Sequence, residues 1–438
     1  MTDSNYINSN QNTERLIKIG IWTYLFLLLF EGALRKWFLP FLSGPLALIR
    51  DPLALLLILM ALKNGFLKLN IYIVSTVFIT TIAVATTFLV GHGNLGVSIY
   101  GARILLIQFP LIFVIGNVLN YKDVIKMGRV FIWIAIPMTM LMILQFYSPQ
   151  TAWVNRGLGG DLEGAGFSGA LGFYRPPGTF SFISGLTQFY GVAACFIMYF
   201  WFKQQEINRY ILILATLGLL AAIPFSISRT LLYQTIITVF FMVIAAFHKS
   251  KYIPKIIFGF AGFVALFMIL INTGFLATPL EAFTSRFEGA TKYEGGVSGT
   301  IIDRYLGGMV NAVTGTADNP FFGHGIGIGT NAGGKLLTGD KVMLIYAEDE
   351  WARLIGESGL LLGLVMIFIR IGLSIQLTIA SYKRLRIGNM LPWLLLSFCL
   401  TIIPNGQWGQ ITTLGFATFS TGILIASFNN KEDLSIQS

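Results

Sequence analysis

The chain has 438 residues, of which 55% are hydrophobic and 11% are charged, and its mean hydropathy is +0.72. Because soluble domains carry about 25% charged residues, this composition excludes an ordinary soluble protein and points to lipid as the solvent. The formal charge of +10 does not call for nucleic acid as a partner, since dispersed lysine and arginine in a membrane protein first report topology.

Long apolar runs predict an all-α fold, a polytopic transmembrane helical bundle of about 12 spans. A transmembrane barrel would show strands of alternating polarity, and these runs of Leu, Ile, Phe and Val do not alternate. The polar segment from Met1 to Glu14 lacks the features of a removable signal, so the first span is expected to be retained. The predicted helices lie near 15–30, 46–62, 70–90, 97–118, 125–147, 181–202, 210–225, 231–247, 253–275, 351–378, 388–403 and 411–427.

Lysine and arginine are distributed unevenly between the two sides of this topology. With the N-terminus inside, most basic residues of the tails and short connections fall on the cytoplasmic side, as the positive-inside rule requires. We therefore expect a bacterial inner-membrane protein with both termini cytoplasmic and its largest loop periplasmic. Lysine dominates inside, whereas the outer side is rich in arginine: Arg35, Arg50, Arg103, Arg156, Arg175, Arg229, Arg286, Arg304 and Arg353.

The outer arginines indicate an anionic ligand that carries phosphate. The planar guanidinium suits bidentate binding of phosphate or carboxylate and stays charged when partly buried. Arg35, Arg50, Arg103 and Arg229 lie near helix ends at membrane level, where an unpaired cation is costly, so they are placed to meet a lipid-linked phosphate. The alternative is that some outer arginines pair with Asp and Glu of the loops.

Two long outer segments stand out, and the longer one divides the chain into nine predicted spans at 1–275, the large loop at 276–350, and three predicted spans at 351–438. The shorter one, 148–180, lies within 1–275. Segment 148–180 is rich in glycine, which permits close backbone approach, and it ends in the residues YRPPGTF. Segment 276–350 is longer than ordinary loops, which indicates a functional segment. Its aromatic and apolar residues predict an ordered lid with short helices over the membrane face.

Two features that suggest a phosphate loop or a metal centre are discounted. Residues 329–336 read GTNAGGKL, but Leu336 stands where a phosphate loop has its magnesium-binding Ser or Thr, and no strand precedes the segment. His92, His248 and His324 are scattered, without the spacing of metal ligands. We therefore predict neither a metal nor a cofactor.

Three consecutive carboxylates, Glu348, Asp349 and Glu350, precede the helix predicted from 351. One interpretation is that the helix macrodipole stabilises them. The other is that they supply a base at the membrane–water interface, which takes a proton from a sugar hydroxyl as it attacks an activated anomeric carbon. Arg353 and Glu357 are four positions apart on one helix face and predict a local ion pair.

Four short motifs occur on the outer side of the predicted topology: NPFFGHGIG at 319–327, ESGLLLG at 357–363, SISR at 226–229, and YRPPGTFS around Arg175. In their order and sidedness they resemble the O-antigen ligase and Wzy-type polymerase superfamily of bacterial surface-glycan assembly. The family's usual His-Asn pair falls on Glu348-Asp349 here. Because of this departure, either a carboxylate, Glu348 or Asp349, takes the role of the histidine, or His324 moves in from the glycine-rich turn, or this branch of the family works differently.

The resemblance implies a GT-C-like, metal-independent glycosyltransferase that works on the outer face of the inner membrane. The donor would be a glycan on undecaprenyl diphosphate, with its lipid tail between helices. Arg229, Arg175 and Arg304, joined by Arg35 and Arg103 at membrane level, would hold the diphosphate and stabilise its growing charge.

The acceptor distinguishes the functions that this resemblance leaves open. A polymerase extends another lipid-linked repeat, with a chain-length regulator as an expected partner, whereas a ligase transfers glycan to lipid A-core or another acceptor. The missing histidine favours the polymerase. The competing class is a transporter of lipid-linked oligosaccharide, but no internal repeat of the transporter kind is detected.

Overall fold

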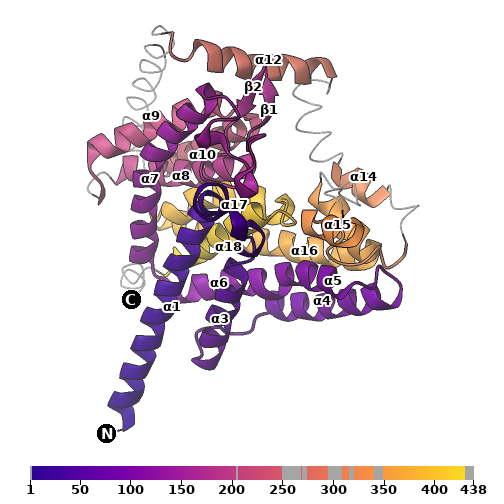
Figure 1. The fold of residues 1–438 in the computed structure, drawn as a ribbon. Coiled ribbons are helices and arrows are strands. Elements are labelled where there is room, and N and C mark those ends of the chain that lie inside the picture. Colours follow the sequence, from indigo (N-terminus) through magenta and orange to yellow (C-terminus); the bar gives the residue numbers. More distant parts are fainter. Residues whose placement is uncertain are drawn as a thin grey trace.

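The structure is a computed structural model that describes residues 2–203, 206–248, 268, 274–293, 308–314, 320–339 and 349–429. Helices dominate it (Figure 1), so the all-α prediction is confirmed. The α-helices are α1 (Thr2–Ala33), α2 (Ser43–Leu46), α3 (Arg50–Lys63), α4 (Ile71–Leu89), α5 (Leu95–Arg103), α6 (Phe109–Val118), α7 (Tyr121–Tyr147), α8 (Ile183–Phe202), α9 (Arg209–Phe225), α10 (Arg229–Phe247), α12 (Ala277–Tyr293), α14 (Gly308–Thr314), α15 (Asn331–Thr338), α16 (Glu350–Arg386), α17 (Leu391–Asn405) and α18 (Ile411–Ala426).

Eight segments of the described chain are long and apolar enough to cross a membrane: Gln11–Phe38, Pro40–Lys63, Ile71–Leu89, Leu95–Val118, Tyr121–Tyr147, Ile183–Phe202, Arg229–Phe247 and Glu350–Arg386. The shorter apolar helices α9, α17 and α18 accompany them. The chain is therefore a helical membrane protein. The helix predicted at 253–275 lies almost entirely outside the described residues, so the number of twelve spans stays a prediction.

Asparagine side chains mark the beginnings of several helices. Asn70, Asn94 and Asn208 each accept a hydrogen bond from a backbone N–H in the first turn of α4, α5 and α9. Asn120 and Asp123 form a reciprocal capping box at the start of α7. The first N–H groups of a helix have no partner within it, so these caps fix where each helix begins.

The core is centred on α8, which packs against α7, α10, α17 and α18. Phe131 of α7 stacks against Phe189 and Phe196 of α8 and against Phe419 of α18, with ring centroids 5.5, 5.9 and 6.2 Å apart. Figure 1 shows α17 and α18 in the middle of the bundle. In lipid, helices associate through close packing rather than through the hydrophobic effect, and these interlocking rings supply that packing.

Segment 148–180, predicted to lie on the outer side, contains local structure that its glycines did not predict. Two 3-10 turns, η4 (Trp153–Asn155) and η5 (Leu158–Gly160), precede a short antiparallel hairpin of β1 (Phe167–Ala170) and β2 (Phe173–Arg175). Helix α12, from the predicted large loop, lies across the top of the view in Figure 1 and contacts β1 and α9. The described part of that loop also contains α14 and α15, so short helices are present in it as predicted.

Three of the expected helices depart from regular α-helical geometry. A π-helical turn, η1 (Leu34–Phe38), extends α1, and another, η3 (Ile104–Gln108), connects α5 to α6. Helix α16 breaks at Gly359, where φ is 79° and ψ is 169°. The side chains of Glu350 and Arg370 meet across the break at 2.7 Å, which shows that the chain folds back at this glycine.

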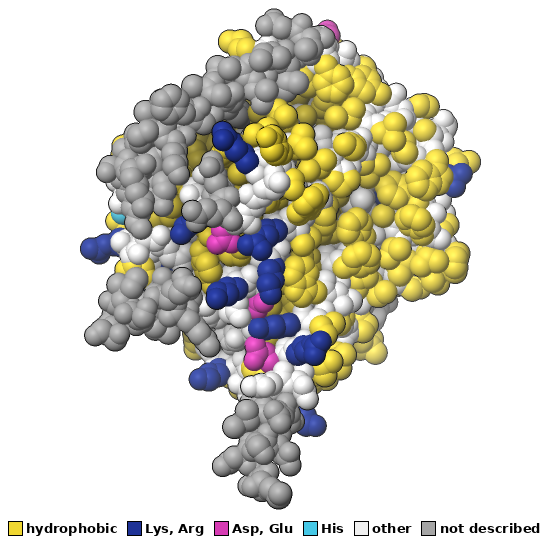
Figure 2. All heavy atoms as spheres, turned by 90° about the vertical axis from the view of Figure 1, so that its left-hand side faces the viewer, with side chains coloured by type: hydrophobic (Ala, Val, Ile, Leu, Met, Phe, Trp, Pro, Cys, Tyr) yellow, Lys and Arg dark blue, Asp and Glu magenta, His cyan; other side chains and the backbone are white. Residues whose placement is uncertain are grey.

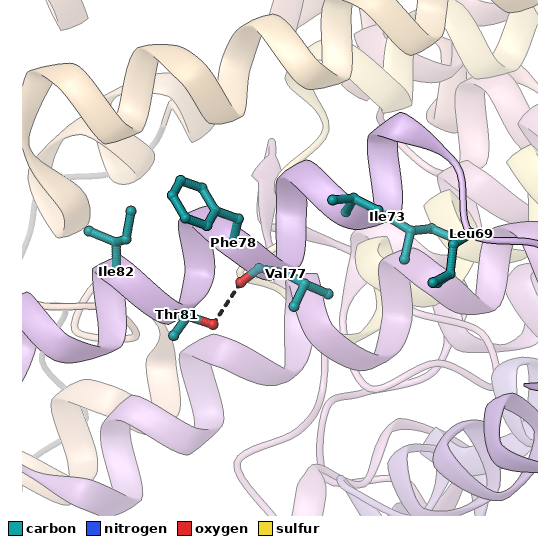
Figure 3. A pocket seen from close by; sticks show the side chains of 7 residues that line it. Leu69, Ile73, Val77, Phe78, Thr81 and Ile82 are labelled. Carbon is teal, nitrogen blue, oxygen red and sulfur yellow. Dashed lines mark hydrogen bonds between the residues drawn. The ribbon is translucent and has the colours of Figure 1, made fainter.

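The outer surface of the bundle suits a lipid environment. Figure 2 shows a broad hydrophobic face bordered by lysine, arginine and acidic side chains. A shallow groove on α4 is also apolar (Figure 3), and it is lined by Leu69, Ile73, Val74, Val77, Phe78, Thr81 and Ile82. The hydroxyl of Thr81 donates to the carbonyl of Val77 at 2.8 Å, so this groove offers contact with acyl chains rather than polar recognition.

Candidate functional site

Three arginines from separate parts of the chain lie close together at the start of α10. Arg175 ends β2, Arg229 is the first residue of α10, and Arg286 lies on α12. The Nη1 of Arg286 donates to the carbonyl of Gly169 in β1 at 3.2 Å, and the Nε of Arg175 donates to the carbonyl of Ser226 at 3.4 Å. The hairpin thus lies between α12 and the turn before α10. We call these three residues the arginine cluster.

The arginine cluster repels positive charge. The pKa of Arg175 is lowered to about 10, first by burial and then by the positive charges of Arg286 and Arg229. Within the part of the chain that the structure describes, no carboxylate lies within ion-pair distance of Arg175. A group whose charged form is disfavoured by its neighbours gains most from an incoming anion. Arg175 is therefore suited to bind an anionic group, such as a phosphate.

The turn before Arg229 is strained and buried. Ile227 has a φ of +46° and is fully buried, a conformation that is rare for a β-branched side chain. The hydroxyl of Ser228 accepts a hydrogen bond from the backbone N–H of Leu231 and so caps α10. Strained residues of this kind concentrate at functional sites, and the start of a helix favours negative charge. The SISR motif therefore contributes Arg229 to the arginine cluster and places a helix N-terminus beside it.

The backbone that follows Arg175 is fixed by polar contacts from the membrane helices. The Nζ of Lys36, fully buried in η1, donates to the carbonyls of Gly178 and Phe180 at 2.7 and 2.9 Å. Gln145 of α7 donates to the carbonyl of Gly178 at 3.2 Å and accepts from its N–H at 2.8 Å. Pro176 and Pro177 connect this clamp to Arg175 through a stiff backbone. The position of Arg175 is therefore set by η1 and α7.

Two of the arginines predicted at membrane level share one acid. Glu31 of α1 accepts from the Nη1 of Arg35 at 2.9 Å and from the Nε of Arg50 at 3.1 Å. Arg103 forms its own ion pair with Asp51 at 2.7 Å. The alternative that outer arginines pair with acids thus holds for these three, although the acids lie on membrane helices rather than in the loops. Arg35 and Arg103 are not part of the arginine cluster.

The acidic residues before α16 differ in their surroundings. Asp349 is the N-cap of α16: its Oδ1 accepts from the N–H of Trp351 at 3.3 Å, and its buried Oδ2 has no hydrogen-bond partner in the described structure. Glu350 is held by Arg353 and Arg370 at 2.8 and 2.7 Å. Burial raises the pKa of Asp349, and Glu350 raises it further, against the backbone N–H groups that lower it. Of these two carboxylates, Asp349 has the free oxygen that a base requires.

The two glycine-containing motifs that carried the family resemblance lie against each other. The N–H of His324 donates to the carbonyl of Gly356, and that of Gly325 donates to the carbonyl of Glu357, both at 2.9 Å. These carbonyls are available because α16 breaks at Gly359. Glu357 also pairs with Arg353 at 2.7 Å, so the predicted ion pair is confirmed. The side chain of His324 is exposed.

Glu348 and Arg304 lie outside the described residues. Among the residues that the structure does describe, no group of three His, Cys, Asp or Glu side chains could hold a metal ion. Arg286 was not predicted as a site residue, because only the hairpin between α12 and α10 brings it to Arg175.

No known protein family, curated protein or solved structure matches this chain.

Proposed function

We propose that this chain is a membrane glycosyltransferase that polymerises undecaprenyl-diphosphate-linked oligosaccharide repeat units on the periplasmic face of the bacterial inner membrane. The convergence of Arg175, Arg229 and Arg286 at the start of α10 carries the proposal. The cluster lies in a helical membrane protein, which suits a donor whose diphosphate is attached to a lipid. The family resemblance of the SISR and YRPPGTF motifs supports the same reading.

The proposed reaction transfers a sugar from diphosphate to a hydroxyl. The acceptor oxygen forms a bond to the anomeric carbon of the donor, while the bond from that carbon to the diphosphate oxygen breaks. The electron pair of the broken bond leaves with the diphosphate, and the hydroxyl proton passes to a base. The arginine cluster would stabilise the negative charge that grows on the leaving oxygen, and preorganised cations of this kind lower the barrier most in the transition state.

The decisive experiment compares two arginines in equivalent helix positions. Arg229 is the first residue of α10 and Arg209 the first residue of α9, where it is exposed and outside the arginine cluster. In purified protein supplied with lipid-linked repeats and no ion gradient, Arg229→Ala should lower the rate of polymer formation by about 10²- to 10³-fold, the usual effect of losing one transition-state donor. Arg209→Ala should retain the parental rate.

The products also separate the competing functions. Long glycan chains on the lipid carrier indicate a polymerase, whereas transfer of preformed glycan to lipid A-core indicates a ligase. A protein that forms no new glycosidic bond but moves lipid-linked sugar across the membrane is a transporter. The proposal is wrong if Arg175→Ala and Arg229→Ala variants, expressed and folded normally, both support the parental glycan profile.

Asp349 is the base that we propose for the acceptor hydroxyl, and it should give the activity an acidic limb. A base works only when it is ionised, so activity should fall as the pH drops through the pKa of Asp349, which burial has raised above its ordinary value of about 4. Asp349→Asn should abolish polymer formation without loss of folding, since Asn caps a helix as well as Asp does. The rival bases are tested with Glu348→Gln and His324→Ala; full activity of Asp349→Asn would transfer the role to one of them.

A further inference from the structure

We propose that Arg103 forms a second, buried oxyanion site, separate from the arginine cluster, which takes a phosphate or carboxylate group. Arg103 ends α5 and is only 6% exposed. Its Nη1 donates to Asp51, but its Nε and Nη2 are buried and have no hydrogen-bond partner in the described structure. Buried donors of a charged group are rarely left unmet, so these two nitrogens point to a ligand.

The two open nitrogens have the geometry that recognises an oxyanion. The Nε and Nη2 of a guanidinium lie on one edge of a planar group, and their parallel N–H bonds match two oxygens of a phosphate or carboxylate. The ring of Tyr100 covers the face of the guanidinium, 4.0 Å from its central carbon. Asp51 occupies Nη1. A ligand therefore approaches Arg103 in the guanidinium plane, along the Nε–Nη2 edge.

The open edge is held in place by a rigid frame. Asp51 accepts from Arg103 through Oδ2 at 2.7 Å and from Gln108 through Oδ1 at 2.6 Å. Arg103 directly precedes the π-helical turn η3 and Gln108 is its last residue. A π turn brings two residues five positions apart closer to the same helix face than a regular α-helix would. The hydroxyl of Tyr24 donates to Gln108 at 2.7 Å. Arg103 is thus pre-positioned before any ligand binds.

The charges around this frame leave room for one more anion. Arg50 pairs with Glu31 and lies over the ring of Tyr24, 5.6 Å from its centroid, which connects the two ion-pair groups. The connected network contains the cations Arg35, Arg50 and Arg103 and the anions Glu31 and Asp51. Three positive charges therefore face two negative charges among membrane helices, where an unbalanced cation is costly. A singly charged oxyanion on Arg103 would balance them.

A matched pair of substitutions tests this site without reference to glycan transfer. Arg103→Lys keeps a positive charge beside Asp51 but removes the two-nitrogen edge. The second substitution is Asp51→Asn. Both variants are made in an Arg175→Lys background, so that phosphate bound at the arginine cluster does not obscure the result. Binding of inorganic phosphate and of farnesyl phosphate is measured by calorimetry on the full chain in detergent, with farnesol as the uncharged control.

The expected result is that Arg103→Lys weakens binding of at least one phosphate probe by 10-fold or more. Binding of farnesyl phosphate alone identifies a lipid-borne oxyanion, and binding of both probes identifies a site for the phosphate group itself. Asp51→Asn is the second variant: removing the competing negative charge should tighten phosphate binding. The proposal is overturned if neither phosphate probe binds the Arg175→Lys protein. It is also overturned if the added Arg103→Lys and Asp51→Asn substitutions both give folded protein that binds phosphate with the affinity of the Arg175→Lys protein. Absence of glycan transfer by the unsubstituted protein, with phosphate binding at Arg103 intact, would count against the proposed function alone.

Discussion

Gly359→Ala is expected to lower the free energy of unfolding by about 3 kcal/mol, through backbone strain and a steric clash together. Gly359 has a φ of 79° with a ψ of 169°, a region that is open essentially to glycine. A methyl group there would overlap the carbonyl oxygen of Phe321. Since the contact between 320–325 and the break in α16 depends on this close approach, the variant should show a lower thermal midpoint and a smaller yield of monodisperse protein.

Two other glycines separate strain from clash. Gly65 has a φ of +73° but no atom within 4 Å of an added methyl group, so Gly65→Ala tests the cost of the backbone conformation alone, about 1 kcal/mol. Gly289 lies in α12 with open space and an ordinary φ, so Gly289→Ala should be neutral or slightly stabilising. If Gly359→Ala and Gly65→Ala lower the free energy of unfolding by the same amount, the close contact between Gly359 and Phe321 is contradicted.

Glu350→Gln is expected to destabilise the protein by about 3–5 kcal/mol, the usual effect of removing one partner from a buried ion pair. Glu350 accepts hydrogen bonds from Arg353 at 2.8 and 3.0 Å and from Arg370 at 2.7 Å, and all three side chains are buried. The neutral amide would leave two guanidinium groups among membrane helices with only Glu357 to balance them. Thermal unfolding of the purified protein in detergent measures the effect.

A surface pair provides the control for Glu350. Glu206 pairs with Arg129 at 2.8 Å, but both side chains are substantially exposed, so Glu206→Gln should change the stability by no more than about 1 kcal/mol. Adding Arg370→Met to Glu350→Gln should restore part of the loss, because one of the uncompensated charges is removed with its acid. Equal stability of the Glu350→Gln and Glu206→Gln variants would show that Glu350 is not a structural acid.

The features that depend on nearby residues were predictable from the sequence. The apolar helices follow from runs of hydrophobic residues, and the ion pair of Arg353 with Glu357 follows from their spacing of one helical turn. Asn120 with Asp123 is a capping signal in the sequence itself. Arg175 and Arg229 were selected from motifs, and the structure brings them close enough for their charges to interact.

The features that depend on distant contacts were not predictable. Arg286 belongs to the arginine cluster only because α12 packs on β1, and nothing in the local sequence specifies that contact. The sharing of Glu31 between Arg35 and Arg50 requires α1 and α3 to lie side by side. Gly359 looked like part of a continuous helix, because a helix break set by tertiary contacts leaves no periodic signal.

The arginine cluster also has a consequence for the helix that brings its third member. Arg175 and Arg229 are carried by the helical bundle and the strand clamped to it, whereas Arg286 arrives on α12. The repulsion that lowers the pKa of Arg175 opposes the approach of α12 when the site is empty, and a bound anion removes that opposition. By linkage, a ligand that favours the docked helix is itself bound more tightly once the helix has docked. The docked position of α12 and the bound negative charge therefore stabilise each other.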